Sequence, residues 1–521
     1  MSRSLALLIS LSLVLAACSG LPASARQRID PGTRVSDPAA NPVANNQIET
    51  VNTPAALPEP PTSEDQEIRK VPTNAPQSEK QAGLPPTSSP DCSLAPSDSG
   101  IVTVRWDEPL RPSQLIVVDP VSELPLCEYP AYLLRDHFSH AFSEDGKTLA
   151  IVDYSETQAH QDLLHLIDLQ TWTAITTTLE MGSWTAAISF NPAGTHLGLI
   201  YGRNRHPKPQ YTFASLNLAT LEVEASAPLD FAPHLLKYSR DGASILVFGG
   251  NEGAREDQLL PAHAVLLNAT DLSTLWEQEL AAIRIGTSEM NVEDDNMPIF
   301  VYWRPAVALS PDRTRLYVVH ADEDKLTTID FGRRDVKTVD ILPKLSWIER
   351  LVYRFAQVAY AKVSNGTYKN AVLSPDGKLL YVSGQTDRAG KDSKGEWQFT
   401  NTPLGLQVID VATGTELARL DTQSNSVIIS PDGVVLYLTG WDDAGEWTDV
   451  VAADTLEVIQ RLPRTSVLRT RSLGGQPVLL ASRQSDVSVR LALLDPGNPD
   501  QVTAWPSRRR VYPGYPLLWE P

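Results

Sequence analysis

The chain has 521 residues, and its 63 Asp and Glu outnumber its 44 Lys and Arg, which gives a formal net charge of -19. An acidic surface repels nucleic acid and anionic lipid, so this balance argues against a nucleic-acid partner. Of the three cysteines, neither Cys92 nor Cys127 has the Cys-x-x-Cys spacing of a metal or redox site, which argues against thiol catalysis.

Residues 1–17 have the features of a secretory signal peptide. Arg3 supplies a positive charge, residues 5–15 are apolar, and Ala16 and Ala17 are small enough for a signal peptidase pocket. Cys18 follows directly, and this arrangement resembles the lipobox of bacterial lipoproteins, in which the cysteine is acylated and begins the mature chain. The resemblance implies an extracytoplasmic protein that is lipid-anchored to a bacterial membrane. The alternatives are an ordinary secreted protein and a short membrane anchor, for which the apolar run is brief.

Residues 18–99 are rich in Pro, Ser, Thr, Asn, Gln and Glu. Such a segment cannot bury enough apolar surface to offset the entropy lost on ordering, so we expect a disordered, Pro-stiffened tether. A tether of this length would hold a folded domain away from the lipid surface.

Cys92 and Cys127 remain once Cys18 is assigned to the lipid. An even number of cysteines in a compartment that permits disulfides predicts one bridge between them. The bridge would join the end of the tether to the first folded hairpin. The alternative is two unpaired, partly buried thiols.

From residue 100 to residue 521 the chain repeats a pair of short apolar strands joined by a tight turn. Two near copies, at 371–382 and 427–438, carry the turn Ser-Pro-Asp-Gly, in which Pro and Gly favour a geometry that lets the flanking strands pair. Looser copies lie at 142–151, 190–199, 238–247 and 309–318, and a seventh runs through 473–480.

A second hairpin follows each copy, and its first strand ends in Asp or Asn, whose side chain caps the next turn. These capping residues are Asp168, Asn217, Asn268, Asp330, Asp410, Asp454 and Asp495. Two hairpins make a four-stranded antiparallel sheet. Radial stacking of such sheets buries both faces and leaves few exposed edges, so the sequence predicts an all-β fold, a β-propeller.

The repeats at 373–382 with 408–414, and at 429–438, resemble the YVTN or WD40-like family of bacterial propellers. That family's repeats read Ser-Pro-Asp-Gly-x-x-Leu-Tyr-Val followed by Val-x-Val-Ile-Asp. The resemblance extends over the region after Ile101, and it implies a fold much more strongly than a function.

The number of blades depends on the residues that come before the seven repeats. Residues 101–106 and 115–119 form an eighth set of apolar strands, and 511–519 could supply a further strand that closes the ring. We therefore favour eight blades, with seven as the alternative.

Two insertions are expected, at 251–300 and 343–365. The apolar residues between 345 and 359 recur at helical spacing after Pro343, which predicts a basic amphipathic helix. This helix would either pack on its own domain or dock on a membrane or partner.

No local signature of catalysis is present: Gly-x-Ser-x-Gly, His-Glu-x-x-His, the phosphate-binding loop and the dinucleotide fingerprint are all missing. Residues 410–417 resemble only the first half of the repeat by which some propeller enzymes bind a quinone, so no cofactor is predicted. The sequence likewise predicts no catalytic residue and no metal ligand. The sequence favours a binding or scaffold module for a protein or glycan partner at the cell envelope over an enzyme. The alternative is a propeller-type hydrolase or lactonase with its site in the central funnel.

Overall fold

The computed structural model describes residues between 101 and 504, and all of them lie in the second of two units, 1–79 and 80–521. The gaps within that span are 106–112, 119–124, 134–137, 155–161, 172, 180–183, 204–209, 251–253, 256–260, 291–298, 344–365, 392–396, 443, 474–475, 485–488 and 496–497. The expected signal peptide, tether and amphipathic helix, together with the possible closing strand at 511–519, fall outside the described residues, except that Pro343 ends strand β23.

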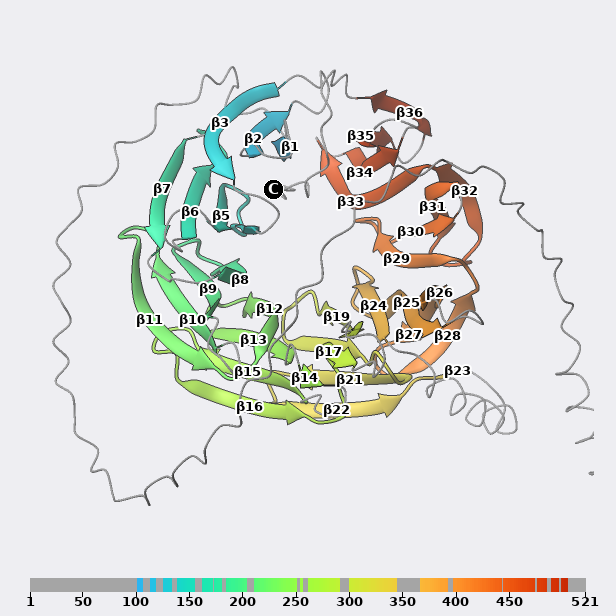
Figure 1. Ribbon diagram of the computed structural model, residues 1–521, viewed down its shortest axis with the longest axis horizontal. Coiled ribbons are helices and arrows are strands. Elements are labelled where there is room, and N and C mark those ends of the chain that lie inside the picture. The colour runs from blue at the N-terminus through green and yellow to red at the C-terminus, as the bar shows by residue number, and fades with distance from the viewer. Residues whose placement is uncertain are drawn as a thin grey trace, which may run out of the picture. The chain divides into compact units, whose positions relative to one another are not determined.

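The described residues form an all-β fold in which each of the seven predicted repeats is an antiparallel meander of four strands. Within the second unit the sheets follow one another around a common centre (Figure 1), and the fold is a β-propeller. The first three meanders are β4 (Phe138–Phe142), β5 (Thr148–Tyr154), β6 (Asp162–Asp168) and β7 (Ala174–Leu179); β8 (Trp184–Phe190), β9 (His196–Arg203), β10 (Gln210–Asn217) and β11 (Glu222–Leu229); and β12 (Ala232–Tyr238), β13 (Ser244–Gly250), β15 (Ala262–Asn268) and β16 (Thr274–Leu280).

The remaining four meanders continue the same order along the chain. They are β19 (Ala306–Leu309), β20 (Arg315–Val319), β21 (Lys325–Asp330) and β22 (Asp335–Asp340); β24 (Gly366–Leu373), β25 (Leu379–Lys391), β27 (Leu406–Asp410) and β28 (Thr415–Leu420); β29 (Ser424–Ile429), β30 (Val435–Asp442), β31 (Gly445–Ala452) and β32 (Val458–Pro463); and β33 (Thr465–Leu473), β34 (Gln476–Gln484), β35 (Val489–Asp495) and β36 (Asn498–Ala504).

The meander β24-β25-β27-β28 is enlarged to nine strands by a strand from its own β25–β27 connection and by segments from three other parts of the chain. Strand β18 pairs in parallel with β24, β23 pairs in parallel with β28, and β26 extends β25 as a hairpin. The added strands are β14 (Ala254–Arg255), β17 (Gly286–Met290), β18 (Ile299–Arg304), β23 (Leu342–Pro343) and β26 (Trp397–Pro403).

The insertion expected at 251–300 is not continuous. Strands β15 and β16, within it, are regular members of the preceding meander, and only the segments on either side of them are added. Spacing between turns cannot separate inserted residues from the strands that they flank, which is why the sequence placed one long insertion there.

A three-stranded sheet comes before the meanders and consists of β1 (Ile101–Arg105), β2 (Ser113–Val118) and β3 (Pro125–Leu133). The extra strands expected near 101–106 and 115–119 are thus confirmed, with β3 in addition. Whether the ring closes with eight or seven blades stays a prediction.

Apolar residues on both faces of the sheets explain the uninterrupted hydrophobic runs in the sequence. In β25, Leu380 and Val382 pack toward the sheet β19–β22, whereas Tyr381 between them packs toward the sheet β29–β32. Successive side chains of a strand point to opposite faces, so a strand between two neighbouring sheets needs apolar residues at every position. Six such clusters join the seven meanders in chain order.

The repeated turns have the same side-chain hydrogen bonds in successive blades. The Ser374 hydroxyl donates to Asp376 Oδ1 at 2.7 Å and accepts from the Leu379 amide at 2.9 Å, and Ser430 repeats both bonds. The Ser374 hydroxyl, aided by Lys378, lowers the pKa of Asp376 to about 2. Gly377 has a φ of +73°, a left-handed conformation that glycine adopts without strain.

The predicted caps of the second hairpins are confirmed in the described turns. Asp168 Oδ1, for example, accepts from the amides of Gln170 and Thr171, and Asn217, Asn268, Asp330, Asp410 and Asp454 likewise accept from backbone amides of their turns.

Candidate functional site

The two ends of the meanders differ. In an antiparallel meander, alternate turns lie at opposite ends of the strands. The Ser-x-Asp-Gly turns and the Asp-capped turns therefore share one end, which we call the turn face. The second connection of each meander and the link to the next sheet lie at the other end, which we call the insertion face.

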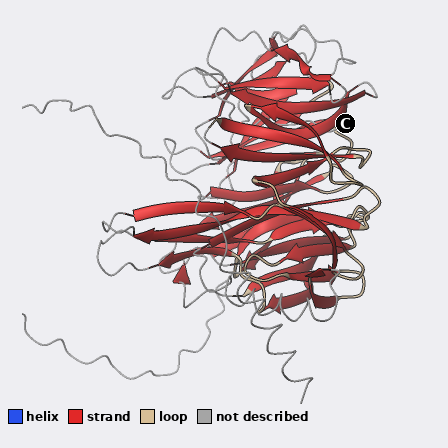
Figure 2. Ribbon diagram, turned by 90° about the vertical axis from the view of Figure 1, so that its right-hand side faces the viewer, coloured by secondary structure: helices blue, strands red, loops and turns tan. Residues whose placement is uncertain are grey.

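The long additions to the meanders that the structure describes, β23 apart, occur at the insertion face. They comprise the segments around β14, β17 and β18 and the β25–β26 hairpin. Figure 2 shows tan turns gathered at one end of the sheets and strands projecting at the opposite end. The insertion face is therefore where this chain departs from a plain propeller.

The β20–β21 loop of the insertion face, residues 320–324, is held by cations from two neighbouring sheets. Lys369 Nζ, on β24, donates to His320 O at 2.6 Å and to Glu323 O at 3.3 Å, and lies 3.9 Å from Asp324 Oδ1. Arg284, which follows β16, reaches Asp322 Oδ2 with its Nε at 3.0 Å. The loop thus connects three successive sheets.

Burial shifts the pKa values in this cluster against the charged forms. It lowers the pKa of the Lys369 ammonium, which Asp324 and Asp322 partly oppose, and it raises the pKa of Asp322 despite the nearby Arg284. A charge in such a place is tolerated when it is paired and hydrogen-bonded. The Lys369 ammonium meets that condition, and Asp322 is paired through its Oδ2, although its buried Oδ1 has no hydrogen-bond partner among the described residues. We interpret the contacts of Lys369 and Arg284 as ordering the loop.

Trp303 lies beside this cluster, with Arg284 Cζ 5.4 Å from the centre of its ring. Its side chain is buried, and its Nε1 has no hydrogen-bond partner among the described residues. The adjacent Tyr302 is instead 59% exposed. Because alternate residues of β18 point to opposite sides, the strand buries one aromatic ring and presents the next to solvent.

A second exposed aromatic ring lies at the tip of the β30–β31 hairpin, also at the insertion face. Trp441 is 65% exposed and pairs across the strands with Glu446. Its neighbour Trp447 is buried, with Arg461 Cζ 4.0 Å from its ring centre, and Arg461 binds Asp449 through two hydrogen bonds.

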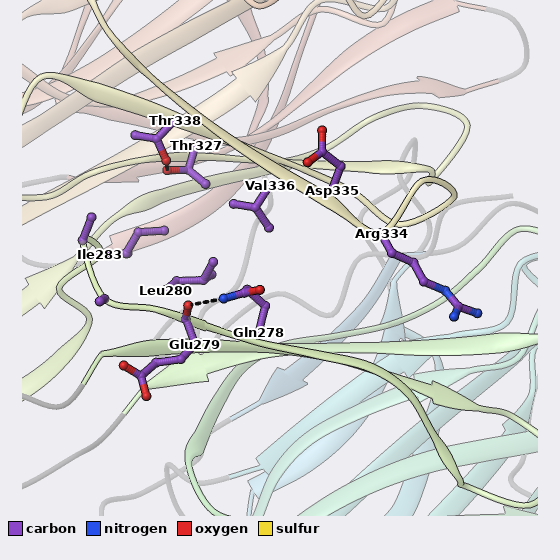
Figure 3. Close-up of a pocket in the computed structure, with 11 residues that line it drawn as sticks. Gln278, Glu279, Leu280, Ile283, Thr327, Arg334, Asp335, Val336 and Thr338 are labelled. Atoms are coloured by element: carbon purple, nitrogen blue, oxygen red, sulfur yellow. Dashed lines mark hydrogen bonds between the residues drawn. The ribbon is translucent and has the colours of Figure 1, made fainter.

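A cavity of about 420 Å³ lies between the sheet β12–β16 and the sheet β19–β22 (Figure 3). Behind it, His320 Nε2 lies 2.8 Å from Thr327 Oγ1, which lies 2.8 Å from Thr338 Oγ1. Burial lowers the pKa of His320 to about 4, which keeps the imidazole neutral at pH 7. The lining is formed by Gln278, Glu279, Leu280, Ala281, Ala282, Ile283, Thr327, Arg334, Asp335, Val336 and Thr338.

The residues singled out from the sequence are not brought together by the described structure. Cys18 and Cys92 lie outside the described residues, and Cys127 lies on β3 opposite Val117. The lipid attachment and the disulfide therefore stay predictions. Within the described segments no group of three His, Cys, Asp or Glu side chains could hold a metal ion, and no helix is long and apolar enough to cross a membrane.

Sequence reasoning missed the cluster around Lys369. One sequence feature could have indicated it: Lys369 lies in the first strand of its repeat, where most positions are buried and a charged side chain is unusual. The acidic run Asp322-Glu-Asp324 in a short inter-strand loop was a second signal. Their juxtaposition could not be read from the sequence, because 45 residues separate Lys369 from Asp324 and the contact depends on the stacking of two sheets.

No protein-family model matches the chain, and no curated protein matches it. The resemblance of the repeats to the YVTN or WD40-like family therefore stays a prediction. Among solved structures, the chain is similar to dihydro-heme d1 dehydrogenase NirN in complex with DHE, with 14% identity over 79% of this chain and 73% of that chain and a TM-score of 0.48.

Two further solved structures show a weaker similarity. The Kuenenia stuttgartiensis hydrazine synthase has 12% identity over 70% of this chain and 99% of that chain, with a TM-score of 0.40. The Myceliophteria thermophila Cps50 (Swd1) β-propeller domain has 10% identity over 68% of this chain and 95% of that chain, with a TM-score of 0.36. At these values the similarities carry no argument about activity, and the chain is assigned a fold, the β-propeller, and no family.

Proposed function

We propose that this chain is an extracytoplasmic, lipid-anchored β-propeller that serves as a binding or scaffold module and uses its insertion face to bind a protein or glycan partner at the cell envelope. The observation that carries the proposal is the difference between the two faces. The turn face repeats short, capped turns, whereas the long additions and the exposed rings of Tyr302 and Trp441 lie at the insertion face.

Loops on a rigid scaffold are where binding residues concentrate, because they vary without disturbing the core. Exposed aromatic rings are also enriched among the residues that contribute most to binding. The contacts of Lys369 and Arg284 with the β20–β21 loop add to this argument, since a fixed loop loses less conformational entropy when it binds a partner.

The envelope part of the proposal is supported by the sequence. The signal-like residues 1–17 and Cys18 supply export and lipid attachment, and the Pro-rich residues 18–99 supply the reach to a partner beyond the membrane surface.

Site-specific photocrosslinking in the native cells tests the binding face. A benzophenone amino acid replaces Tyr302 or Trp441 at the insertion face, and Val434, which is 60% exposed in a turn of the opposite face, is the matched control. We expect adducts from at least one insertion-face position and none from Val434. Equal labelling at Val434, or no adduct from either insertion-face position, would contradict the proposal.

Metabolic labelling with an alkynyl fatty acid tests the anchor separately. The wild-type chain is expected to take up the label, and Cys18→Ala to lose both the label and membrane association. A labelled Cys18→Ala variant, or an unlabelled wild type, would exclude lipid attachment at this cysteine.

A further inference from the structure

Three charged residues, Glu279, Arg334 and Asp335, belong to the lining of the cavity between β16 and β22, and the other eight lining residues are uncharged. On β16, Gln278 and Leu280 share one face and Glu279 lies on the other. On β22, Val336 and Thr338 share one face and Asp335 lies on the other, so these two charged side chains are not on the faces of Leu280 and Val336. Figure 3 shows the side chains of Glu279 and Arg334 directed away from the central Leu280 and Val336. A charged ligand would lose hydration there without gaining an opposite charge, so a neutral ligand fits the interior better.

The polar groups of the interior suit a ligand with hydroxyls. Thr327 and Thr338 are hydrogen-bonded to each other at 2.8 Å, and Thr327 is also held by His320. A Thr hydroxyl has one donor and two acceptor positions, so exposed Thr338 has capacity left for a ligand. Gln278 donates one amide hydrogen to Glu279 O at 2.9 Å and has a second hydrogen and a carbonyl oxygen besides.

The aliphatic part of the lining complements these polar groups. Leu280 and Ile283 are buried in the core cluster shared by the two sheets, and Val336 packs against the same cluster. Leu280 is 6% and Ile283 2% exposed, so the half-buried Val336 supplies most of the apolar surface that a ligand could contact. This surface lies next to hydroxyls and an amide, which matches a sugar ring with its C–H groups on one side and its hydroxyls at the rim. A cavity of about 420 Å³ is within the usual size of small-molecule sites.

We propose that this cavity binds a neutral pyranose unit of a glycan, with Thr338 and Gln278 bonded to its hydroxyls and Val336 against its ring. The inference deepens the proposed function, on which it rests, by naming the class of partner and a second place of contact at the outer rim of the propeller.

Ligand-observed saturation-transfer NMR on the mature, full-length chain tests it. The probes are the methyl glycosides of glucose, galactose, mannose and N-acetylglucosamine, with glucuronic acid and glucosamine as charged controls. We expect saturation transfer to at least one neutral glycoside and none to the charged sugars. Ala281→Trp, at an exposed position of the lining, should abolish the signal by filling the cavity.

Thr338→Val keeps the shape of the side chain and removes the hydroxyl, so it should weaken binding by roughly 3- to 10-fold, the usual effect of one lost hydrogen bond. The matched control is Thr176→Val, because Thr176 occupies the equivalent outer-strand position and bonds His165 at 2.9 Å in a different blade. Thermal unfolding of each variant verifies that it is folded.

The proposal is overturned if no neutral glycoside gives saturation transfer at about 20 mM, a concentration that would fill a site with a millimolar dissociation constant. It is also overturned if Thr176→Val weakens binding as much as Thr338→Val does. Transfer to the charged sugars alone, or competition only by an extended peptide, would also overturn it. If photocrosslinking gives adducts at the insertion face but no sugar binds, the sugar site is refuted and the proposed function stands. If a sugar binds but no adduct forms, the insertion face is refuted as the binding surface.

Discussion

Two buried histidines, His165 and His320, predict part of the dependence of this propeller's stability on pH. His165 is 3% exposed and His320 is fully buried, and burial lowers the pKa of each to about 4 from the ordinary 6.5. Between these values the unfolded chain binds protons that the folded chain does not. The stabilisation is therefore complete above pH 6.5 and is lost progressively as the pH falls toward 4.

The size of the effect follows from the two pKa values. Lowering the pH from 7.5 to 5.0 costs about 2 kcal/mol of unfolding free energy for each histidine, since each pKa unit between the folded and unfolded states corresponds to about 1.4 kcal/mol. The two sites lie in different blades and share no contact, so their contributions should add to about 4 kcal/mol.

Urea unfolding, followed by tryptophan fluorescence at pH 7.5 and 5.0, measures this difference for the wild type, His165→Gln, His320→Gln and the double variant. Glutamine keeps a polar side chain next to the threonine partner and does not titrate. Each single variant should reduce the pH difference by about 2 kcal/mol. The reasoning is refuted if the double variant shows the full wild-type difference, or if NMR titration of the folded protein finds either imidazole pKa near 6.5.

Two further predictions concern the disulfide and the buried lysine. Thiol titration of the unfolded, unreduced mature protein should find no free thiol from Cys92 and Cys127, and two free thiols would rule out the bridge. Lys369→Met removes the ammonium that donates hydrogen bonds to the carbonyl oxygens of His320 and Glu323. This change should lower the unfolding free energy by about 1–3 kcal/mol and speed amide hydrogen exchange in residues 320–325. Unchanged exchange in that loop would show that its order does not depend on Lys369.

Much of the fold follows from local patterns. Ser374 and Asp376 are two residues apart, and the turn that they close needs only their side chains and a glycine with positive φ. The hairpins on either side follow from the same turn, because it sets which residues of the two strands face each other. The meanders that contain the Ser-x-Asp-Gly turn could be predicted for this reason, and the others by their similarity to them.

The sites depend on contacts between residues that are far apart in the chain. Strand β18 pairs with β24 across about sixty residues, which brings Trp303 opposite Thr367 and places Lys369 two residues farther along β24. The cavity likewise exists only where β16 of one sheet faces β22 of the next. Nothing in either segment alone indicates its partner.

The sequence by itself therefore determined the repeat, its turns and the class of fold, because each rests on interactions between residues a few positions apart. The tertiary structure alone decided which loop Lys369 and Arg284 hold in place, which parts of 251–300 are inserted, and where the cavity forms. The physical reason is that the stacking of successive sheets brings together segments that are about forty to sixty residues apart in the chain. The local pattern of one segment does not show which residues of the distant segment will contact it.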